Sequence, residues 1–389
     1  MEARLLIPIQ ILSVGLSNSR RNSMQCRLVY QWAVLTLMAT TWAFADGGAD
    51  HQKAQPFPIK LGTSGGNVND SSRLFCCSGT LGSLVTKNGM QYILSNNHVL
   101  ARSNQASPGE DISQPGLIDN NCRIPPIVAD FTETPSLGAK NVDAAIALVR
   151  SGAVDPTGYI LDIGPLSPDA QPASIGLSVK KSGRTTGLTT GTIGSINTDV
   201  NVQYQSGCGK GKKFTISYRN QVVIKGSGFS AGGDSGSLIV TNADSNPQPV
   251  GLLFAGSSTS TIGNPIQDVI NALGISFSTT SSTGSTGSAN LSASISIEGP
   301  AASELDYAKT VKERHKKELF ALEPVLGIGV GQDDDNPSEA VIVVYLETGR
   351  PLPQRLSRRL DGLKVKVVTT ERFVAYGNEK WGDNTSSAK

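Results

Sequence analysis

Ser235 stands in a glycine-rich stretch whose residue types could support chemistry. Residues 227–240 read SGFSAGGDSGSLIV, so the serine follows paired glycines and precedes an apolar run. Gly232 and Gly233 allow a backbone turn that side chains would block, and such a turn can aim the amides of Gly233 and Ser235 at one point. Two convergent N–H groups beside a hydroxyl suit acyl transfer, because they stabilise the oxyanion. The stretch predicts Ser235 as nucleophile, with Gly233 and Ser235 forming an oxyanion hole.

A serine nucleophile needs a base, and the chain has only three histidines. His51 lies in a polar N-terminal stretch that we expect to fray, and His315 lies in KERHKKE, which is typical of a solvated helix face. His98 ends the apolar run YILSNNHVL, so a rigid strand would deliver it to a loop-lined site. His98 is therefore the predicted general base.

The third role in serine hydrolysis is a buried carboxylate that holds the imidazole tautomer. Asp143 opens the strand-like run VDAAIALV and is its only charge. An unpaired carboxylate there would be costly, and a histidine hydrogen bond removes that cost. Asp111, Asp119 and Asp130 are alternatives, but none of them begins such a run. The sequence predicts a triad of His98, Asp143 and Ser235.

The elements that must position these residues read as strands. From residue 60 to 275 the chain alternates short apolar runs with Gly, Asn, Asp and Pro, which is typical of a mainly β barrel or sandwich. Asn88-Gly89 lies between two alternating runs and predicts a hairpin. GSLIVTNADSNPQPVGLLFAG predicts a second hairpin, and NPIQDVINALGI predicts a short helix that closes the body at Gly274.

A second region follows this body. Residues 276–297 are nearly all Ser, Thr, Gly and Ala, which predicts a flexible linker. Residues 298–389 predict a small α+β domain of unknown role. Its predicted elements are a helix capped by Ser303, the strands VLGIGVG and AVIVVYLE, a short basic helix near QRLSRRL, and the strand KVKVVTT.

The N-terminus indicates export. The apolar run WAVLTLMATTW follows several arginines and precedes Ala43-Phe44-Ala45, a small-x-small pattern. Residues 1–45 are therefore predicted to be a signal peptide cleaved after Ala45, translated from Met1 or Met24. An uncleaved anchor is the alternative. We expect a secreted or periplasmic protein, with no membrane contact beyond the export signal.

Charge and cysteine content add limits. The 34 basic and 32 acidic residues leave a net charge of +2, which gives no reason to expect nucleic acid as a partner. Cys76, Cys77, Cys122 and Cys208 would remain after cleavage, an even number in an oxidising compartment. Neighbouring cysteines rarely bond each other, so we expect Cys76 and Cys77 each to bond one of the other two. Buried free thiols are the alternative.

NNHVL, VDAAIALV and GGDSGS, in the order His, Asp, Ser, resemble the trypsin-like serine peptidases of the chymotrypsin fold. LSNNHVLA, QPGLID and the appended small domain are similar to the narrow-leaf type of these peptidases, found in plants and bacteria. The resemblance spans residues 60–275. It implies two six-stranded β-barrels with the triad between them, and a protein or peptide substrate.

The resemblance also implies roles around the triad. KSGRTTGLTTGT is similar to a block of the bacterial members whose arginine neutralises the acid before the serine, which predicts an ion pair between Arg184 and Asp234. Phe229 occupies the position that floors the primary pocket, so a basic residue before the cleaved bond is not expected. The strand residues Phe254, Ala255 and Gly256 match those that pair with the substrate backbone.

Competing readings are fewer. GTSGG resembles a nucleophile elbow, but the chain continues as loop where that fold needs a helix. Two spare histidines without an H-E-x-x-H motif leave too few metal ligands, so neither a metal nor a cofactor is expected. An esterase could use the same triad on small substrates. The main alternative is a catalytically idle protease-fold scaffold that binds partners through its C-terminal domain. The sequence does not determine the oligomeric state.

Overall fold

The computed structural model describes residues 49–209, 211–277 and 299–375. All of them belong to one compact unit of the chain, Ala45–Lys389. The other unit, Met1–Phe44, lies outside the described residues, and so does the predicted signal peptide of residues 1–45. No helix in the described ranges is both long and apolar enough to cross a membrane.

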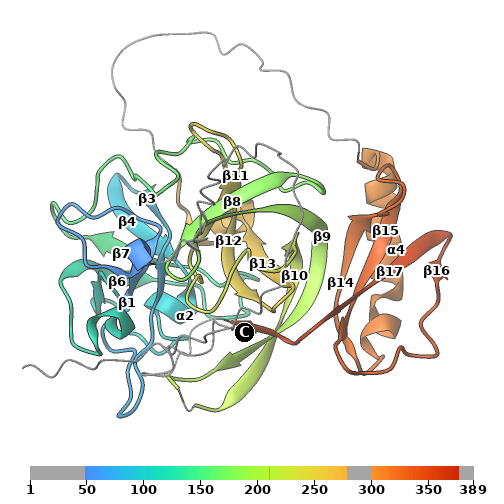
Figure 1. The fold of residues 1–389 in the computed structure, drawn as a ribbon, viewed down its shortest axis with the longest axis horizontal. Coiled ribbons are helices and arrows are strands. Elements are labelled where there is room, and N and C mark those ends of the chain that lie inside the picture. The colour runs from blue at the N-terminus through green and yellow to red at the C-terminus, as the bar shows by residue number, and fades with distance from the viewer. Residues whose placement is uncertain (1–48, 210, 278–298, 376–389) are drawn as a thin grey trace, which may run out of the picture. The chain divides into compact units, whose positions relative to one another are not determined.

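The first barrel, in blue to teal in Figure 1, has seven antiparallel strands among the described residues, in the order β2-β1-β5-β6-β7-β4-β3. Only Gly82 separates β2 from β3, so the two form one interrupted strand. That strand pairs with β1 at one end and with β4 at the other, which closes the barrel. The strands are β1 (Thr63–Asn67), β2 (Gly79–Leu81), β3 (Ser83–Lys87), β4 (Met90–Ser95), β5 (Asp111–Ser113), β6 (Ile127–Glu133) and β7 (Ala145–Val149).

The second barrel, green to yellow, closes more simply. Among the described residues its strands follow the order β10-β13-β12-β11-β8-β9, and β9 pairs again with β10. The result is a ring of six antiparallel strands: β8 (Ser178–Gly183), β9 (Gly187–Gln205), β10 (Lys213–Lys225), β11 (Leu238–Thr241), β12 (Pro249–Gly256) and β13 (Ser260–Pro265). The predicted chymotrypsin-like double β-barrel is thereby confirmed.

Local signals in the sequence explain several elements. Asn88 and Gly89 adopt positive φ angles of 51° and 77° between β3 and β4, as the predicted hairpin requires. The predicted helix is α3 (Ile266–Leu273), and Gly274 ends it with a φ of 65°. The first two residues of the predicted linker belong to the body, because Ser276 pairs with Thr86 and Phe277 is buried in the first barrel's core. The rest of it, residues 278–297, lies outside the described residues.

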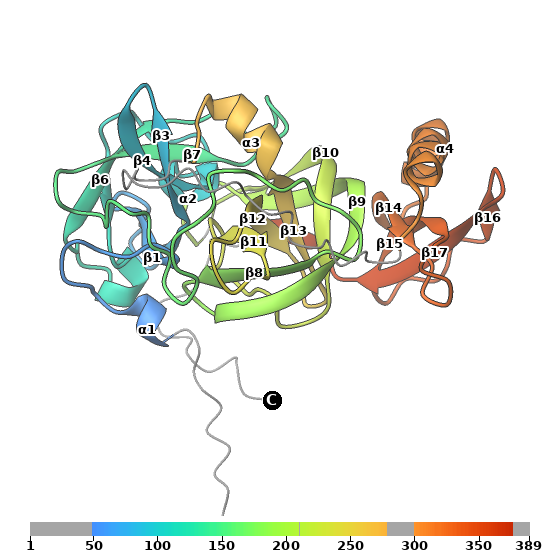
Figure 2. The ribbon, with the colours of Figure 1, turned by 90° about the horizontal axis from the view of Figure 1, so that it is seen from above.

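The C-terminal region contains α4 (Ala302–Phe320), β14 (Val325–Gln332), β15 (Ala340–Glu347), β16 (Arg359–Leu360), β17 (Leu363–Thr370) and β18 (Phe373–Ala375). It extends the second barrel's sheet, because β14 pairs antiparallel with β9. In Figure 2, α4 lies on one face of the sheet formed by β14, β15 and β17. Lys312 of this helix is fully buried, and its Nζ lies 3.1 Å from Oδ1 of Asp199 in β9.

Two predictions in this region are wrong. QRLSRRL forms no helix, because Asp361-Gly362 turns the chain with positive φ angles and pairs Leu360 with Leu363 in a hairpin. Ser303 does not cap α4, since the helix begins at Ala302 after Ala301.

The cysteine prediction is confirmed. Disulfides join Cys76 to Cys122 and Cys77 to Cys208. The first lies within the N-terminal half of the body. The second ties a loop of the first barrel to the connection between β9 and β10 of the second barrel.

Candidate active site

Each residue of the predicted triad lies at the end of a barrel element. His98 is in α2 (Asn97–Leu100), the single turn that follows β4, and Asp143 lies two residues before β7. Ser235 lies in the loop that leads into β11 of the second barrel. Their exposed fractions are 7%, 0% and 0%. The two barrels thus hold an imidazole, a carboxylate and a hydroxyl in largely dry environments.

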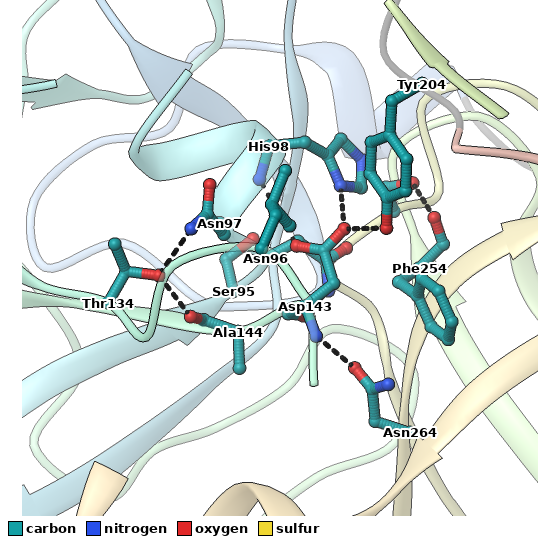
Figure 3. Close-up of polar contacts among 12 residues, drawn as sticks. Ser95, Asn96, Asn97, His98, Thr134, Asp143, Ala144, Tyr204, Phe254 and Asn264 are labelled. Atoms are coloured by element: carbon teal, nitrogen blue, oxygen red, sulfur yellow. Dashed lines mark hydrogen bonds and ion pairs between the residues drawn. The ribbon is translucent and has the colours of Figure 1, made fainter. Parts of the chain in front are cut away.

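His98 and Asp143 meet closely, as Figure 3 shows. Nδ1 of His98 lies 2.6 Å from Oδ2 of Asp143, and the backbone N–H of His98 donates to Oδ1 at 3.2 Å. An ionised carboxylate accepts only, so this contact places the proton of a neutral imidazole on Nδ1 and leaves Nε2 as the basic nitrogen. This is the tautomer that a general base for serine requires.

The second barrel fixes Asp143 as well. The hydroxyl of Tyr204 donates to Oδ2 of Asp143 at 2.8 Å, and the backbone N–H of Asp143 donates to Oδ1 of Asn264 at 3.0 Å. Burial, followed by the charge of Asp143, raises the pKa of Tyr204 well above its ordinary value, so the phenol stays protonated and remains a donor. The hydroxyl of Tyr218 lies 2.8 Å from that of Tyr204.

Sequence reasoning missed Tyr204. It lies in β9, a strand of 19 residues whose last part, residues 199–205, alternates polar and apolar side chains. An aromatic residue at a buried position of such a strand is typical of a core, and nothing near it in the sequence indicates Asp143. Only the pairing of the strands brings the phenol to the carboxylate.

The Ser235 hydroxyl has a different partner in this structure. Its Oγ donates to the carbonyl of Phe254 at 3.3 Å, and no hydrogen bond joins it to His98 within the described ranges. A transfer of the serine proton to Nε2 of His98 would first require this bond to Phe254 to break.

The turn before Ser235 has the features of an oxyanion hole. Gly233 has a φ of 95°, and a Cβ there would lie 2.4 Å from both Nη1 of Arg184 and Oγ1 of Thr185. The N–H groups of Gly233 and Ser235 donate to no acceptor among the residues that the structure describes. Buried amides are normally paired, so two unpaired donors beside one hydroxyl are suited to a developing negative charge.

The predicted ion pair between Arg184 and Asp234 is wrong. Arg184 forms a fork with Asp119 instead, through Nε at 2.7 Å and Nη2 at 2.9 Å. Its Nη1 lies close to Gly233, where an added Cβ would approach it to 2.4 Å. The planar guanidinium suits this bidentate contact, which a carboxylate buried under the Ser235 turn could not offer.

Lys181 is the cation that lies next to Asp234. Its Nζ is 3.6 Å from Oδ2 of Asp234, and both side chains are fully buried. It also donates to Thr186 and to the carbonyl of Gly187. Burial lowers the pKa of Lys181, and the charge of Asp234 opposes that shift. The sequence could have indicated a buried lysine here. Adjacent residues of a strand face opposite sides, so one of Lys180 and Lys181 must point into the barrel.

Asp234 is anchored by several donors besides Lys181. The amides of Thr185 and Ala231 donate to its carboxylate at 2.8 and 2.9 Å, and the hydroxyl of Thr186 does so at 2.7 Å. These bonds join Asp234 to the turn at Thr185 and Thr186 and to Ala231, which precedes it in the same loop. They therefore fix the turn that carries Gly233 and Ser235.

The structure contradicts one of the two predictions about substrate contacts and agrees in position with the other. Phe229 is only 3% exposed and packs in the core of the second barrel with Ile193, Ile224 and Leu253, so it does not line an open pocket. Phe254, Ala255 and Gly256 do form the end of β12 beside Ser235. Ala255 and Gly256 are already paired there with β18 of the same chain.

Two further groups near the site were not foreseen. Asp70 lines a small cavity together with His98 and Arg102, and burial raises its pKa to about 7. His51 does not fray: it is 1% exposed and Nε2 lies 2.9 Å from the hydroxyl of Ser182. Within the described ranges, the one cluster with metal-ligand geometry is Asp70, Cys77 and Cys208. Its two sulfurs are bonded to each other in a disulfide, so they are not thiolate ligands.

Comparison with known proteins gives the following matches. The family model described as the Nal1 C-terminal domain matches residues 142–264, less than half of the chain. This span includes Asp143 and Ser235 but not His98. A search of curated protein sequences finds no match.

Several solved structures are similar. A glutamic acid specific serine protease, described as using a histidine triad in substrate binding, is 22% identical with a TM-score of 0.40 and covers 57% of this chain and 100% of its own. The chymotrypsin of Cellulomonas bogoriensis is 20% identical with a TM-score of 0.39, covering 57% and 99%. Protease A of Thermobifida fusca is 20% identical with a TM-score of 0.38, covering 57% and 98%.

Proposed function

We propose that the chain is a secreted or periplasmic serine endopeptidase of the narrow-leaf type, acting on protein or peptide substrates. One observation supports the proposal most strongly: Nδ1 of His98 lies 2.6 Å from Asp143, and the turn that carries Ser235 presents two amides that have no acceptor among the described residues. A base, an orienting carboxylate and an oxyanion hole together form the machinery of acyl transfer.

The mechanism follows from these groups. Ser235 turns toward His98, and Nε2 removes the hydroxyl proton as Oγ attacks the substrate carbonyl. The amides of Gly233 and Ser235 stabilise the oxyanion, and Asp143 stabilises the imidazolium. The imidazolium then protonates the leaving amine, which departs and leaves an acyl-enzyme. Water, deprotonated by His98, releases the acid and restores the serine. No cofactor takes part in these steps.

The proposed preference at the cleaved bond is for a side chain that is not basic. This preference rests on the resemblance alone, which shows no acidic residue at the position of Phe229; Phe229 itself is packed in the core, so other residues would line the pocket. A mixed peptide library incubated with the protein, and read by mass spectrometry, tests both activity and preference. We expect new termini that are absent with Ser235→Ala. Identical peptides with both proteins would contradict the proposal.

A catalytically idle binding protein is the second candidate, and one observation favours it. The Ser235 hydroxyl bonds the Phe254 carbonyl, and β18 covers part of the strand where a substrate would pair. Under that alternative the library would stay intact while the full chain still captured a partner through its C-terminal region.

A further inference from the structure

β18 lies where a peptide substrate would be expected. Ala375 pairs with Ala255 and Val374 pairs with Gly256, in antiparallel orientation to β12. On its other side β18 runs parallel to β9, with Phe373 opposite Val202 and Val374 opposite Gln203. This short strand therefore fills the space between two strands of the second barrel.

The position of β18 is close to the proposed catalytic residues. Phe254, whose carbonyl accepts the Ser235 hydroxyl, directly precedes Ala255 in β12. Ala375 lines the small cavity that His98 and Tyr204 also line. An extended segment added antiparallel to a strand edge is how peptides bind by β-strand addition.

We propose that β18 is an intramolecular peptide ligand, bound at the edge of β12, that must leave before a peptide substrate can pair there. The inhibition of catalysis rests on the proposed peptidase function. The binding of β18 at the edge of β12 can be measured whether or not the protein is a peptidase. The C-terminal region then acts as a competitive inhibitor of the site to which it is attached.

The anchoring of β18 shows which part can release. Phe373 is fully buried, with its ring centroid 5.8 Å from that of Tyr345, and Glu371 accepts the amide of Ser258 at 3.1 Å. Val374 and Ala375 are only partly buried. The chain is therefore held firmly up to Phe373, whereas the two residues that pair with β12 can detach without unpacking that aromatic contact.

The resident strand also indicates the ligand class. It is an extended, uncharged backbone segment that places a β-branched side chain opposite Gly256 and a small one opposite Ala255. Gly256 offers no side chain to crowd a branched neighbour. Substrates of the site are expected to carry the same types at these two positions, because they would replace β18 on the same edge.

The direct test is binding of a fluorescent peptide with the sequence of residues 371–380, ERFVAYGNEK, to full chains that all carry Ser235→Ala. Val374→Pro removes an N–H from a strand paired on both sides and should displace β18. Val374→Ala is the matched control, because it trims the side chain and keeps the N–H. We expect the chain with Val374→Pro to bind the peptide about tenfold tighter or more than the chain with Val374→Ala and the chain with Ser235→Ala alone. The reason is that each backbone hydrogen bond between the peptide and the vacated edge of β12 adds modestly to affinity.

Equal affinity of all three chains for this peptide, or equal binding of a scrambled peptide, would overturn the proposal. A chain ending at Phe373 keeps the buried anchor and repeats the comparison if the proline variant does not fold. In chains that keep Ser235, Val374→Pro should raise the rate of peptide hydrolysis. Labelling of the same chains by a small fluorophosphonate shows separately whether the serine is activated. Absent labelling would remove the proposed peptidase function, and the binding comparison would still decide the occupancy of β12.

Discussion

At the scale of single residues, Asp143 is the group on which the site depends. Its contact with His98 could be foreseen, because a carboxylate that begins an apolar strand needs a partner and the chain offers few histidines. Its contact with Tyr204 could not, since the phenol comes from the other barrel. Long-range pairing of strands, and not local pattern, decides which side chain reaches a buried charge.

Tyr204→Phe tests the role of this phenol as a positioning residue. Losing a hydrogen bond to a charged group should lower kcat/KM about tenfold to a hundredfold. The remaining carboxylate would interact more strongly with the imidazolium, so the pH midpoint of activity should move upward. Tyr218→Phe is the matched control, because it leaves the bond from Tyr204 to Asp143 intact. Equal losses in both variants, with unshifted pH profiles, would mean that Tyr204 only fills space.

Lys181→Met tests the buried ion pair beneath the Ser235 turn. Removing one partner of such a pair leaves an uncompensated charge on Asp234 and should cost about 3–5 kcal/mol of unfolding free energy. Lys180→Met changes the neighbouring lysine, whose Nζ donates to the carbonyl of Ala243 and, among the described residues, pairs with no carboxylate. Urea denaturation of both variants gives the comparison. A small and similar loss of unfolding free energy in Lys181→Met and Lys180→Met would contradict the ion pair assigned to Lys181 and Asp234.

At the scale of elements, dipeptides that require positive φ angles were the most dependable signals. Asn88-Gly89 predicts its hairpin directly, whereas the arginines and leucines before Asp361-Gly362 predict a helix that the structure does not contain. The same signal was present in both places. Turn chemistry outweighed helical composition in the second, because a two-residue turn fixes the register of the strands around it.

The Ser235 turn can be tested with two glycines that share a positive φ. Gly233→Ala should reduce kcat about 10²- to 10³-fold, because the new Cβ would displace Arg184 or Thr185 and misplace the oxyanion donors. Gly228→Ala, at a φ of 83° with no atom within 4 Å of its Cβ, carries the same backbone strain without that collision. Comparable losses of activity in the two variants would show that strain alone explains the effect.

At the scale of the whole molecule, the predicted barrels and cysteine pairs were accessible from the sequence, but the attachment of the C-terminal region was not. Composition suggested a tethered domain after a linker. The structure pairs β14 with β9, buries Lys312 against Asp199 and places β18 on β12. These contacts join residues more than 100 positions apart, and a pattern read along the chain carries no information about them.

The two disulfides differ in the span that they close. Cys77–Cys208 closes 131 residues and Cys76–Cys122 closes 46. Replacing either pair by serines should cost about 2–5 kcal/mol, and loop entropy makes the longer span more costly by about 1 kcal/mol. Urea unfolding of the two double variants measures the difference. A larger loss for the shorter span would indicate that native packing around the sulfurs decides the outcome.

The most direct measurement of the central claim is the rate at which a fluorophosphonate labels the folded chain, read by intact mass. We predict one adduct per chain, located on Ser235 and lost in Ser235→Ala and His98→Ala. Ser230→Ala removes a serine from the same loop and should label like the wild type. Unlabelled wild type that is demonstrably folded, or labelling that survives Ser235→Ala, would contradict an activated nucleophile at this site.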